Sequence, residues 1–464
     1  MSAIQDFTKG PLFKPLVLFS LPFMLANGLQ VLYSVVDMLI VGRYVGEVGL
    51  AAISNAGRMF VFQTLLALGF SAAGQVYISQ LVGQGRYRDL NQTIGTFFTF
   101  FILMGLGLTV FFLAFAKPFL NLMAVPDGTY RDSRLYLIIC TAGLVFTYVY
   151  NMIAAVLRGL GDSFHPFLYI AIASAVNIVL DIVFIVCCGM GVAGAGLATS
   201  LGQIVSGLLS LSFLYRRRKQ YQFDFRPERF RPDKAIVLAF LKLGLPLGMR
   251  YSLVNISMMV VLRMVNDYGT AAAAVFGIGC TIDDTITKMT QGIMQASTGI
   301  IGQNWGARHF GRIRRTVWYA WFLSASFYLP FGILIVCAPR FLFSFFSDSP
   351  SVLEMAPVFV NAIVWSFPAL VLLRGTNGFV NGIGNMKLAF LLGLLDSLVL
   401  RIGLCWLLGS YLGYGFQGYV FAFGTSVYGL CLPVLVYFFF LNWERRGLST
   451  APENSCPALH KDLL

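Results

Sequence analysis

Charged side chains are scarce in this sequence. Lysine, arginine, aspartate and glutamate make up 11% of its 464 residues, whereas a soluble domain carries about 25%. Hydrophobic residues make up 58%, in runs that are too long for the helices of a soluble core. Because a bilayer core about 30 Å thick takes roughly 20 apolar residues per helix, we expect an all-α polytopic membrane protein. Solid apolar runs without alternation argue against membrane strands.

Metal-ligand and disulfide patterns are also missing. Most of the 8 cysteines lie inside apolar runs, where they form neither a metal motif nor a disulfide framework. The 3 histidines lie at loop edges or in the tail, and we expect no cofactor. A cleavable signal peptide is not expected either, because Asp6 lies near the start and the first apolar stretch is long enough to remain as a span.

The net charge of +13 raises the question of a nucleic-acid partner. The basic residues are concentrated in two segments, YRRRKQYQFDFRPERFRPDK (215–234) and GARHFGRIRR (306–315). Membrane proteins collect lysine and arginine in their cytoplasmic loops, so the charge indicates topology and we discount nucleic acid. The expected partners are the lipid bilayer and a small-molecule substrate, with no obligate protein partner.

About twelve apolar stretches are long enough to span a bilayer. An even number places both termini on one side, and the basic loops make that side the cytoplasm, beneath the inner (plasma) membrane. The predicted spans are residues 16–40, 52–79, 94–116, 135–157, 166–188, 193–215, 236–265, 271–300, 316–338, 356–376, 388–409 and 417–441.

The two halves of the chain contain similar motifs at a constant distance. ISQLVGQGR (78–86) resembles IGQNWGARH (301–309), and RGLGD (158–162) resembles NGIGN (381–385), both 223 residues apart. A duplication predicts an N-terminal six-helix lobe (1–220), a C-terminal six-helix lobe (221–445) and a cytoplasmic tail (446–464). Because six is an even number, the two lobes have the same orientation, an architecture known from transporters.

The stretch SAVNIVLDIVFIV (174–186) places a carboxylate in an apolar helix. Asn177 and Asp181 are four residues apart, and Ser174 lies on the same helix face. Carboxylate, amide and hydroxyl oxygens can bind sodium, a hard cation, and a carboxylate can also hold and release a proton. The alternative is a structural carboxylate that bonds across helices. Because an ionisable residue inside a membrane is functional by default, we favour the functional interpretation.

Four segments, in order, resemble the multidrug and toxic compound extrusion (MATE) transporters. They are SLPFMLANGLQVLYSVVDMLIVGRYVGEVGLAA (20–52), ISQLVGQGRYRDL (78–90), LRGLGDSFHP (157–166) and GVAGAGLATSLGQ (191–203). The resemblance implies an antiporter that exports small organic, cationic or polar compounds in exchange for protons or sodium ions by alternating access. The sequence looks most similar to the DinF-like prokaryotic branch, whose polar cluster matches Asp37, Asn177, Asp181 and Thr199 here. This cluster is the predicted coupling site, for a proton or for sodium.

The carboxylates of this cluster have no counterpart in the second half. NorM-like members of the family carry acidic coupling residues in the seventh and tenth helices, but the seventh helix here (247–265) has no carboxylate. At the repeat offset, Asp37 corresponds to Val261 and Asp181 to Leu404. Packing of a six-helix lobe therefore does not require the two carboxylates, which points to a function of the N-terminal lobe alone.

A group of charged residues lies inside the spans of the second half. They are Arg250 and Arg263 in the seventh span, Asp283, Asp284 and Lys288 in the eighth, and Asp396 and Arg401 in the eleventh. One interpretation is mutual pairing, of Asp284 with Lys288 and of Asp396 with a neighbouring arginine. The other is a substrate cavity, to which Arg250, Asp283, Asp284, Lys288 and Arg401 would contribute. A mixed-charge wall would favour polar or zwitterionic cargo over apolar cations.

These features predict a secondary active exporter, and two alternatives remain. The first is a lipid-linked precursor flippase of the related superfamily, which would favour a strongly cationic cavity. The second is a membrane-embedded transferase, because DDTITK (283–288) faintly resembles the aspartate-rich motif of membrane prenyl transferases. A second such motif is missing from the sequence, so we expect no enzyme activity.

Overall fold

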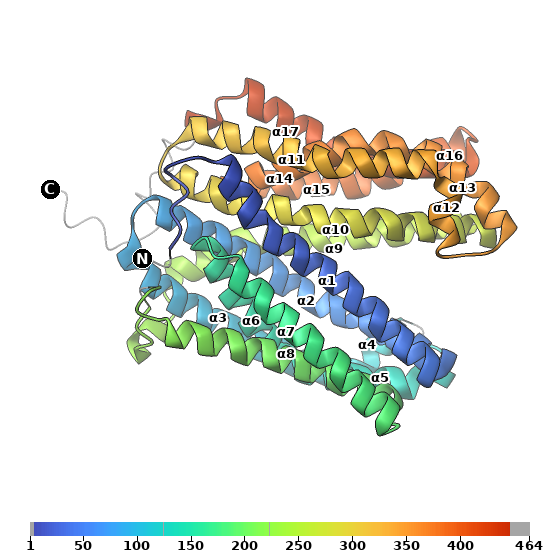
Figure 1. The fold of residues 1–464 in the computed structure, drawn as a ribbon, viewed down its shortest axis with the longest axis horizontal. Coiled ribbons are helices and arrows are strands. Elements are labelled where there is room, and N and C mark those ends of the chain that lie inside the picture. The colour runs from blue at the N-terminus through green and yellow to red at the C-terminus, as the bar shows by residue number, and fades with distance from the viewer. Residues whose placement is uncertain (1–3, 124, 222, 446–464) are drawn as a thin grey trace. The chain divides into compact units, whose positions relative to one another are not determined.

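A computed structural model describes residues 4–123, 125–221 and 223–445. Within these residues the chain is helical and has no strand, and long helices dominate the fold (Figure 1). The predicted tail (446–464) lies outside the described residues.

The helices of the first half include a bent pair and a π-helical turn. They are α1 (Phe13–Tyr44), α2 (Gly46–Gly83), α3 (Tyr87–Ala114), α4 (Ala116–Leu122), α5 (Asp127–Ala142), α6 (Leu144–Gly159), α7 (Phe164–Asp181), its π-helical continuation Ile182–Cys187, and α8 (Gly191–Arg216). α5 and α6 meet at an angle of 45° across Gly143, and together they correspond to one predicted span.

The helices of the second half follow the same order, with more interruptions. They are α9 (Lys234–Asn266), α10 (Thr270–Gly306), α11 (Phe310–Cys337), α12 (Pro339–Ser344), α13 (Pro350–Ile363), α14 (Phe367–Gly382), α15 (Met386–Leu394), the π-helices Leu395–Ile402 and Cys405–Tyr411, α16 (Gly415–Thr425) and α17 (Tyr428–Phe440). Short 3-10 turns cover Pro227–Phe230 and Val364–Ser366.

Each of the twelve predicted spans corresponds to one of these helices or to a run of consecutive ones. In the described chain, 10 helical segments are long and apolar enough to cross a membrane, and the bent pair α5–α6 makes an eleventh. The remaining one, α10, is 37 residues long but carries polar and charged side chains among its apolar ones. The predicted all-α, multi-pass membrane fold of two six-helix lobes is confirmed.

Two compact units make up the structure, and they do not divide the chain at a single point. One unit contains Leu25–Gly248 with residues 4–6, and the other contains Phe7–Met24 with residues 249–445. α1 and α9 therefore each contribute residues to both units. Pro22 and Pro246 lie inside these helices, each three residues before the first residue of the next unit. A proline removes one hydrogen bond of the helix ladder, which membrane helices tolerate.

The basic segment 215–234 is fixed to the first unit. The ring of Phe230 packs on Phe98 of α3, with centroids 5.4 Å apart, and its carbonyl accepts a hydrogen bond of 2.7 Å from Thr99. The hydroxyl of buried Tyr221 donates to the carboxylate of Asp162 over 3.0 Å. Burial, and then the nearby Asp162 carboxylate, raises the pKa of Tyr221 above its usual value, so the phenol keeps the proton that it donates. The longest polar break of the sequence is therefore an ordered strap.

Candidate ion-coupling site

Asp181 lies where α7 changes from α-helix to π-helix. It is the last residue of α7, and the π-helical turn Ile182–Cys187 follows directly. Such turns are rare and occur frequently at functional sites. Asp181 is 0% exposed and Asn177 is 4% exposed, and Ser174 is also buried. The predicted common face of these three residues therefore points into the first unit.

Asp37 of α1 lies close enough to Asp181 for the two carboxyl groups to interact. Asp37 is half-buried, whereas Asp181 is enclosed. Of the lysine, arginine and histidine residues that the structure describes, none forms an ion pair with either carboxylate. Two carboxylates at one site cannot both remain ionised at low energy, so this pair requires a proton or a bound cation.

The polar atoms of the pair also lack hydrogen-bond donors. Among the described residues, none donates to either oxygen of Asp181 or to Oδ1 of Asp37, and both amide atoms of Asn177 are buried without a partner. A buried polar group without a partner is unfavourable by a few kcal/mol. A hard cation held by carboxylate and amide oxygens would satisfy these atoms, and so would a proton shared between the two carboxyl groups.

Thr199 of α8 is connected to the carboxylates through a tyrosine. Its side chain approaches the phenol of Tyr136 on α5, and Tyr136 in turn interacts with Asp37. Tyr33 interacts with both Asp37 and Asp181. Sequence reasoning missed both tyrosines. Tyr33 precedes Asp37 by four residues on one helix and could have been found by that spacing, whereas Tyr136 gives no such signal.

Glycines allow the helices around the site to approach one another. A Cβ atom added to Gly202 of α8 would lie 3.3 Å from the carbonyl oxygen of Ala173 and 3.4 Å from Cβ of Asn177. One added to Gly143, at the bend between α5 and α6, would lie 2.5 Å from Oγ of Ser200. Small residues at helix contacts let backbones pack closely in membranes. The face of α7 that carries Asn177 and Asp181 is held against α8 in this way.

The site offers oxygen ligands and no transition-metal set. Two carboxylates and an amide oxygen suit a hard cation. No group of three or more histidine, cysteine, aspartate or glutamate residues that could hold a metal ion occurs in the described part of the chain. The arrangement can hold either a proton or a monovalent cation.

Charged residues of the second unit form pairs. Lys288 lies 3.3 Å from Asp284, and both side chains are exposed. Arg401 lies 2.8 Å from Asp396, and both are buried. These are the two pairings predicted from the sequence, and both are confirmed. Asp283 is half-buried and forms no ion pair within the described residues, although it lies within electrostatic range of arginines of its unit.

A buried arginine of the second unit was missed. Arg374 on α14 is 4% exposed, and it donates from Nε to Thr290 over 3.1 Å and from Nη2 to the hydroxyl of Tyr328 over 2.9 Å. Its position inside the tenth predicted span was a sufficient signal, since a charge in a membrane span is rare.

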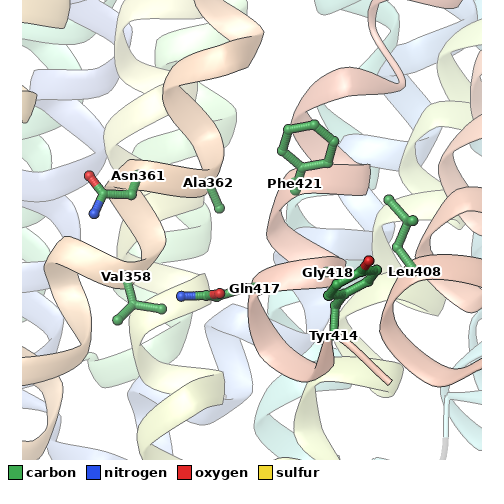
Figure 2. A pocket seen from close by; sticks show the side chains of 8 residues that line it. All are labelled: Val358, Asn361, Ala362, Leu408, Tyr414, Gln417, Gly418 and Phe421. Atoms are coloured by element: carbon green, nitrogen blue, oxygen red, sulfur yellow. The ribbon is translucent and has the colours of Figure 1, made fainter. Parts of the chain in front are cut away.

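The pocket in Figure 2 is separate from all predicted site residues. It has a volume of about 440 Å³ and lies among α13, α16 and the π-helix Cys405–Tyr411. Its polar lining residues are Asn361, Tyr414 and Gln417, beside apolar side chains such as Phe421. Because none of its lining residues is charged, this pocket is not the mixed-charge substrate cavity that we predicted.

Known proteins resemble this chain in both sequence and structure. The MatE family matches residues 22–183 and again 246–407, so the two matches begin 224 residues apart and confirm the internal repeat. A probable multidrug resistance protein, YpnP of Bacillus subtilis, is 28% identical over 96% of this chain and 99% of its own. The multidrug export protein MepA of Staphylococcus haemolyticus is 23% identical over 78% and 79%.

A solved structure of an outward-facing MATE-family transporter of the MOP superfamily has the same fold. Its TM-score is 0.86 at 22% identity, and the match covers 96% of each chain. A MATE structure in the bent conformation gives the same TM-score at 23% identity, over 96% of this chain and 97% of that one. Because the family match covers both halves of the repeat and more than half of the chain, the protein belongs to the MatE family and is a transporter of the MATE type, not an enzyme.

Proposed function

We propose that this transporter exports small organic compounds, polar or cationic, in exchange for protons or sodium ions that bind at Asp37 and Asp181. The names of its relatives, multidrug resistance and multidrug export proteins, support efflux as the direction of transport. The observation that carries the proposal is the pair of neighbouring carboxylates without a cationic partner among the described residues of the first unit. The membership of the DinF-like branch stays a prediction.

The two carboxylates have different roles because they differ in solvent exposure. Asp37 is half-buried and can exchange a cation or a proton with water, while the enclosed Asp181 binds it more deeply. The empty pair carries two negative charges that repel each other, and one bound proton or sodium ion reduces this to a single negative charge, so loading favours whichever conformation packs the pair more tightly. A ligand shifts a conformational equilibrium only by its difference in affinity for the two states. Antiport follows if the loaded state and the cargo-bound state exclude each other.

The residues around the pair can distinguish the two candidate ions. Sodium needs several oxygen ligands, so loss of the Asn177 amide or the Thr199 hydroxyl should weaken a sodium site. A proton shared by Asp37 and Asp181 needs neither. The variants Asn177→Ala and Thr199→Val therefore separate the two mechanisms, and the control is Ser210→Ala, which removes a buried hydroxyl of α8 that donates to the carbonyl of Gly207.

The test is efflux from proteoliposomes with sodium and proton gradients imposed independently. We expect one of the two gradients to drive export by the wild-type protein. If sodium is the coupling ion, Asn177→Ala should raise the sodium concentration that gives half-maximal export, and Ser210→Ala should leave it unchanged. Export that is equally fast without either gradient would contradict the proposal.

We further propose that both termini lie in the cytoplasm and that the protein resides in the inner (plasma) membrane.

A further inference from the structure

Two arginines of the second unit are held by neutral partners. Arg250 on α9 donates from Nη2 to Oδ1 of Asn377 over 3.2 Å. Arg374 on α14 donates to the hydroxyl oxygens of Thr290 and Tyr328. Neither arginine forms an ion pair with a residue that the structure describes. A charge inside a membrane span is unfavourable by several kcal/mol unless it is compensated, so two such arginines in one unit require an explanation.

Both guanidinium groups lie at the same turn of α14: Arg374 belongs to this turn, and Arg250 of α9 donates a hydrogen bond to it. Arg374 and Asn377 are three residues apart on that helix and therefore lie on neighbouring positions of one face. The stem of Arg250 is fixed from the other side, because a Cβ atom added to Gly393 of α15 would lie 2.6 Å from its Cγ atom. Arg250 is half-buried and Arg374 is buried. The arrangement is preorganised, with Arg250 as the group that an incoming molecule can reach.

The interior of this unit has more cations than anions. Within the predicted spans of this unit, the described charged residues that are not exposed are three arginines (Arg250, Arg374 and Arg401) and two carboxylates. One of the carboxylates, Asp396, accepts a hydrogen bond from Arg401 over 2.8 Å. The other, Asp283, lies within electrostatic range of Arg374 and Arg401 without pairing with either. The exposed pair of Asp284 and Lys288 adds no net charge. One positive charge is therefore left without a carboxylate.

The packing of a six-helix lobe does not require these arginines. At the repeat offsets of 224 and 223 residues, Arg250 corresponds to Ala26 and Arg374 to Asn151. The first unit therefore forms the corresponding helices without an arginine at either position. The guanidinium group matches a carboxylate by two parallel N–H···O bonds, and the one hydrogen bond of Arg250 to a described residue involves a neutral acceptor.

We propose that Arg250, supported by the charge of Arg374, binds a carboxylate group of the cargo. The cargo class of this exporter is then an organic zwitterion or acid, and a cation without an acidic group binds more weakly. This inference rests on the proposed export function, and it adds the substrate class and the residue that recognises it. Arg374 acts as a positioning residue, since its side chain is enclosed and its Nε and Nη2 atoms donate to Thr290 and Tyr328.

The test compares a dye that has a free carboxylate with its ester, which lacks the carboxylate charge. Rhodamine B is a zwitterion, and its ethyl ester is a cation of nearly the same size. Binding to the purified, detergent-solubilised transporter is measured by fluorescence anisotropy, without any ion gradient. We expect the wild-type protein to bind the acid more tightly than the ester. Arg250→Gln should weaken acid binding roughly tenfold or more, as expected for the loss of a charge-assisted hydrogen bond, and should leave ester binding unchanged or stronger.

Three further variants exclude a purely structural effect. Arg263→Gln changes an exposed arginine of the same helix and should alter neither affinity. Arg250→Lys keeps the charge and should recover part of the preference for the acid. Arg374→Gln, like Arg250→Gln, should reduce the preference for the acid. Its melting temperature shows whether this variant folds. If it does not fold, the result for Arg250→Gln alone decides whether the inference holds.

The outcome is independent of the coupling proposal. Equal affinity of the wild-type protein for acid and ester, no binding of the acid, or an equal loss of both dyes in Arg250→Gln would overturn the inference. The variant Asp181→Asn should keep the acid preference in this binding assay while losing gradient-driven export, so that a failure of ion coupling and a failure of carboxylate recognition give different results.

Discussion

The two units of this transporter share a sequence repeat but differ in how they treat buried charge. In the first unit, Asp37 and Asp181 lie together with no cationic partner among the described residues. In the second unit, Asp396 is bonded to Arg401, and further arginines lie nearby. A carboxylate that already has a guanidinium partner gains little from a proton or a sodium ion. The difference suggests that the helices were kept after duplication while the charged residues of the two units diverged. Cations would then be exchanged in the first unit only.

The largest expected effect is the loss of export on neutralising the first unit. We predict that Asp37→Asn and Asp181→Asn each abolish gradient-driven export, because an amide can neither take up a proton nor balance a cation. Drug efflux from cells and the amount of folded protein in the membrane are the two measurements. The control is Asp284→Asn, an exposed carboxylate of the second unit, which should keep export. Unimpaired export by both first-unit variants would remove the coupling hypothesis.

The next effect concerns stability and should be opposite in the two units. Asp396→Leu leaves Arg401 buried without its partner, so we expect a loss of about 3 kcal/mol, the lower end for a broken buried ion pair. Asp181→Leu removes a buried carboxylate that forms no ion pair with a described residue, so no cation loses its partner. The free energy of unfolding should therefore stay the same or increase. Melting temperatures of the purified variants give the comparison. Equal destabilisation by the two substitutions would show that Asp181 is a packing residue.

The third prediction is that the two units share one orientation across the membrane. The spans then place the exposed Cys187 and Cys188 of the first unit, and the exposed Cys337 of the second, on the side opposite the basic loops. A membrane-impermeant maleimide should label single-cysteine variants at 187, 188 and 337 in intact cells. A variant with only Cys456, in the predicted cytoplasmic tail, should react only after the membrane is opened. Ready labelling of Cys456 from outside would contradict this topology.

The smallest effect is expected for the exposed pair of the second unit. Lys288→Ala removes one partner of a solvent-exposed ion pair, and such pairs contribute about 0–1 kcal/mol. We therefore expect a near-normal melting temperature. A shift in substrate preference toward cations as large as that of Arg250→Gln would place Lys288 in contact with cargo. An unchanged preference would make the pair structural.

Much of this comparison can be predicted from the sequence. Length and apolar character are enough for eleven of the twelve spans, whereas α10 is long but carries polar and charged side chains. Two motifs at one spacing are enough for the repeat. The common face of Asn177 and Asp181 follows from helical periodicity, and the pairing of Asp284 with Lys288 follows from the same rule. In these cases a local pattern determines which side chains meet.

Other features depend on contacts between distant segments. The approach of Asp37 to Asp181, of Tyr33 to both carboxylates and of Tyr136 to Asp37 requires the packing of three helices, which no single periodicity describes. The passage of α1 from one unit to the other is also invisible in a continuous apolar run. The strap at 215–234 looks like a polar linker, but its phenylalanines bury themselves on the first unit. Arg374 was predictable in principle, as a lone charge in an apolar span, and it was overlooked.

The claim that the first unit alone carries the coupling ion is tested most directly by measuring ion movement against a cargo gradient. Proteoliposomes are loaded with cargo, and the uptake of protons or sodium that its exit drives is recorded for wild type, Asp181→Asn and Asp283→Asn. Asp283 is the matched control, since it is the half-buried carboxylate of the second unit that has no ion pair among the described residues. The account predicts ion uptake by wild type and by Asp283→Asn, and none by Asp181→Asn. Uptake that persists in Asp181→Asn and disappears in Asp283→Asn would contradict it.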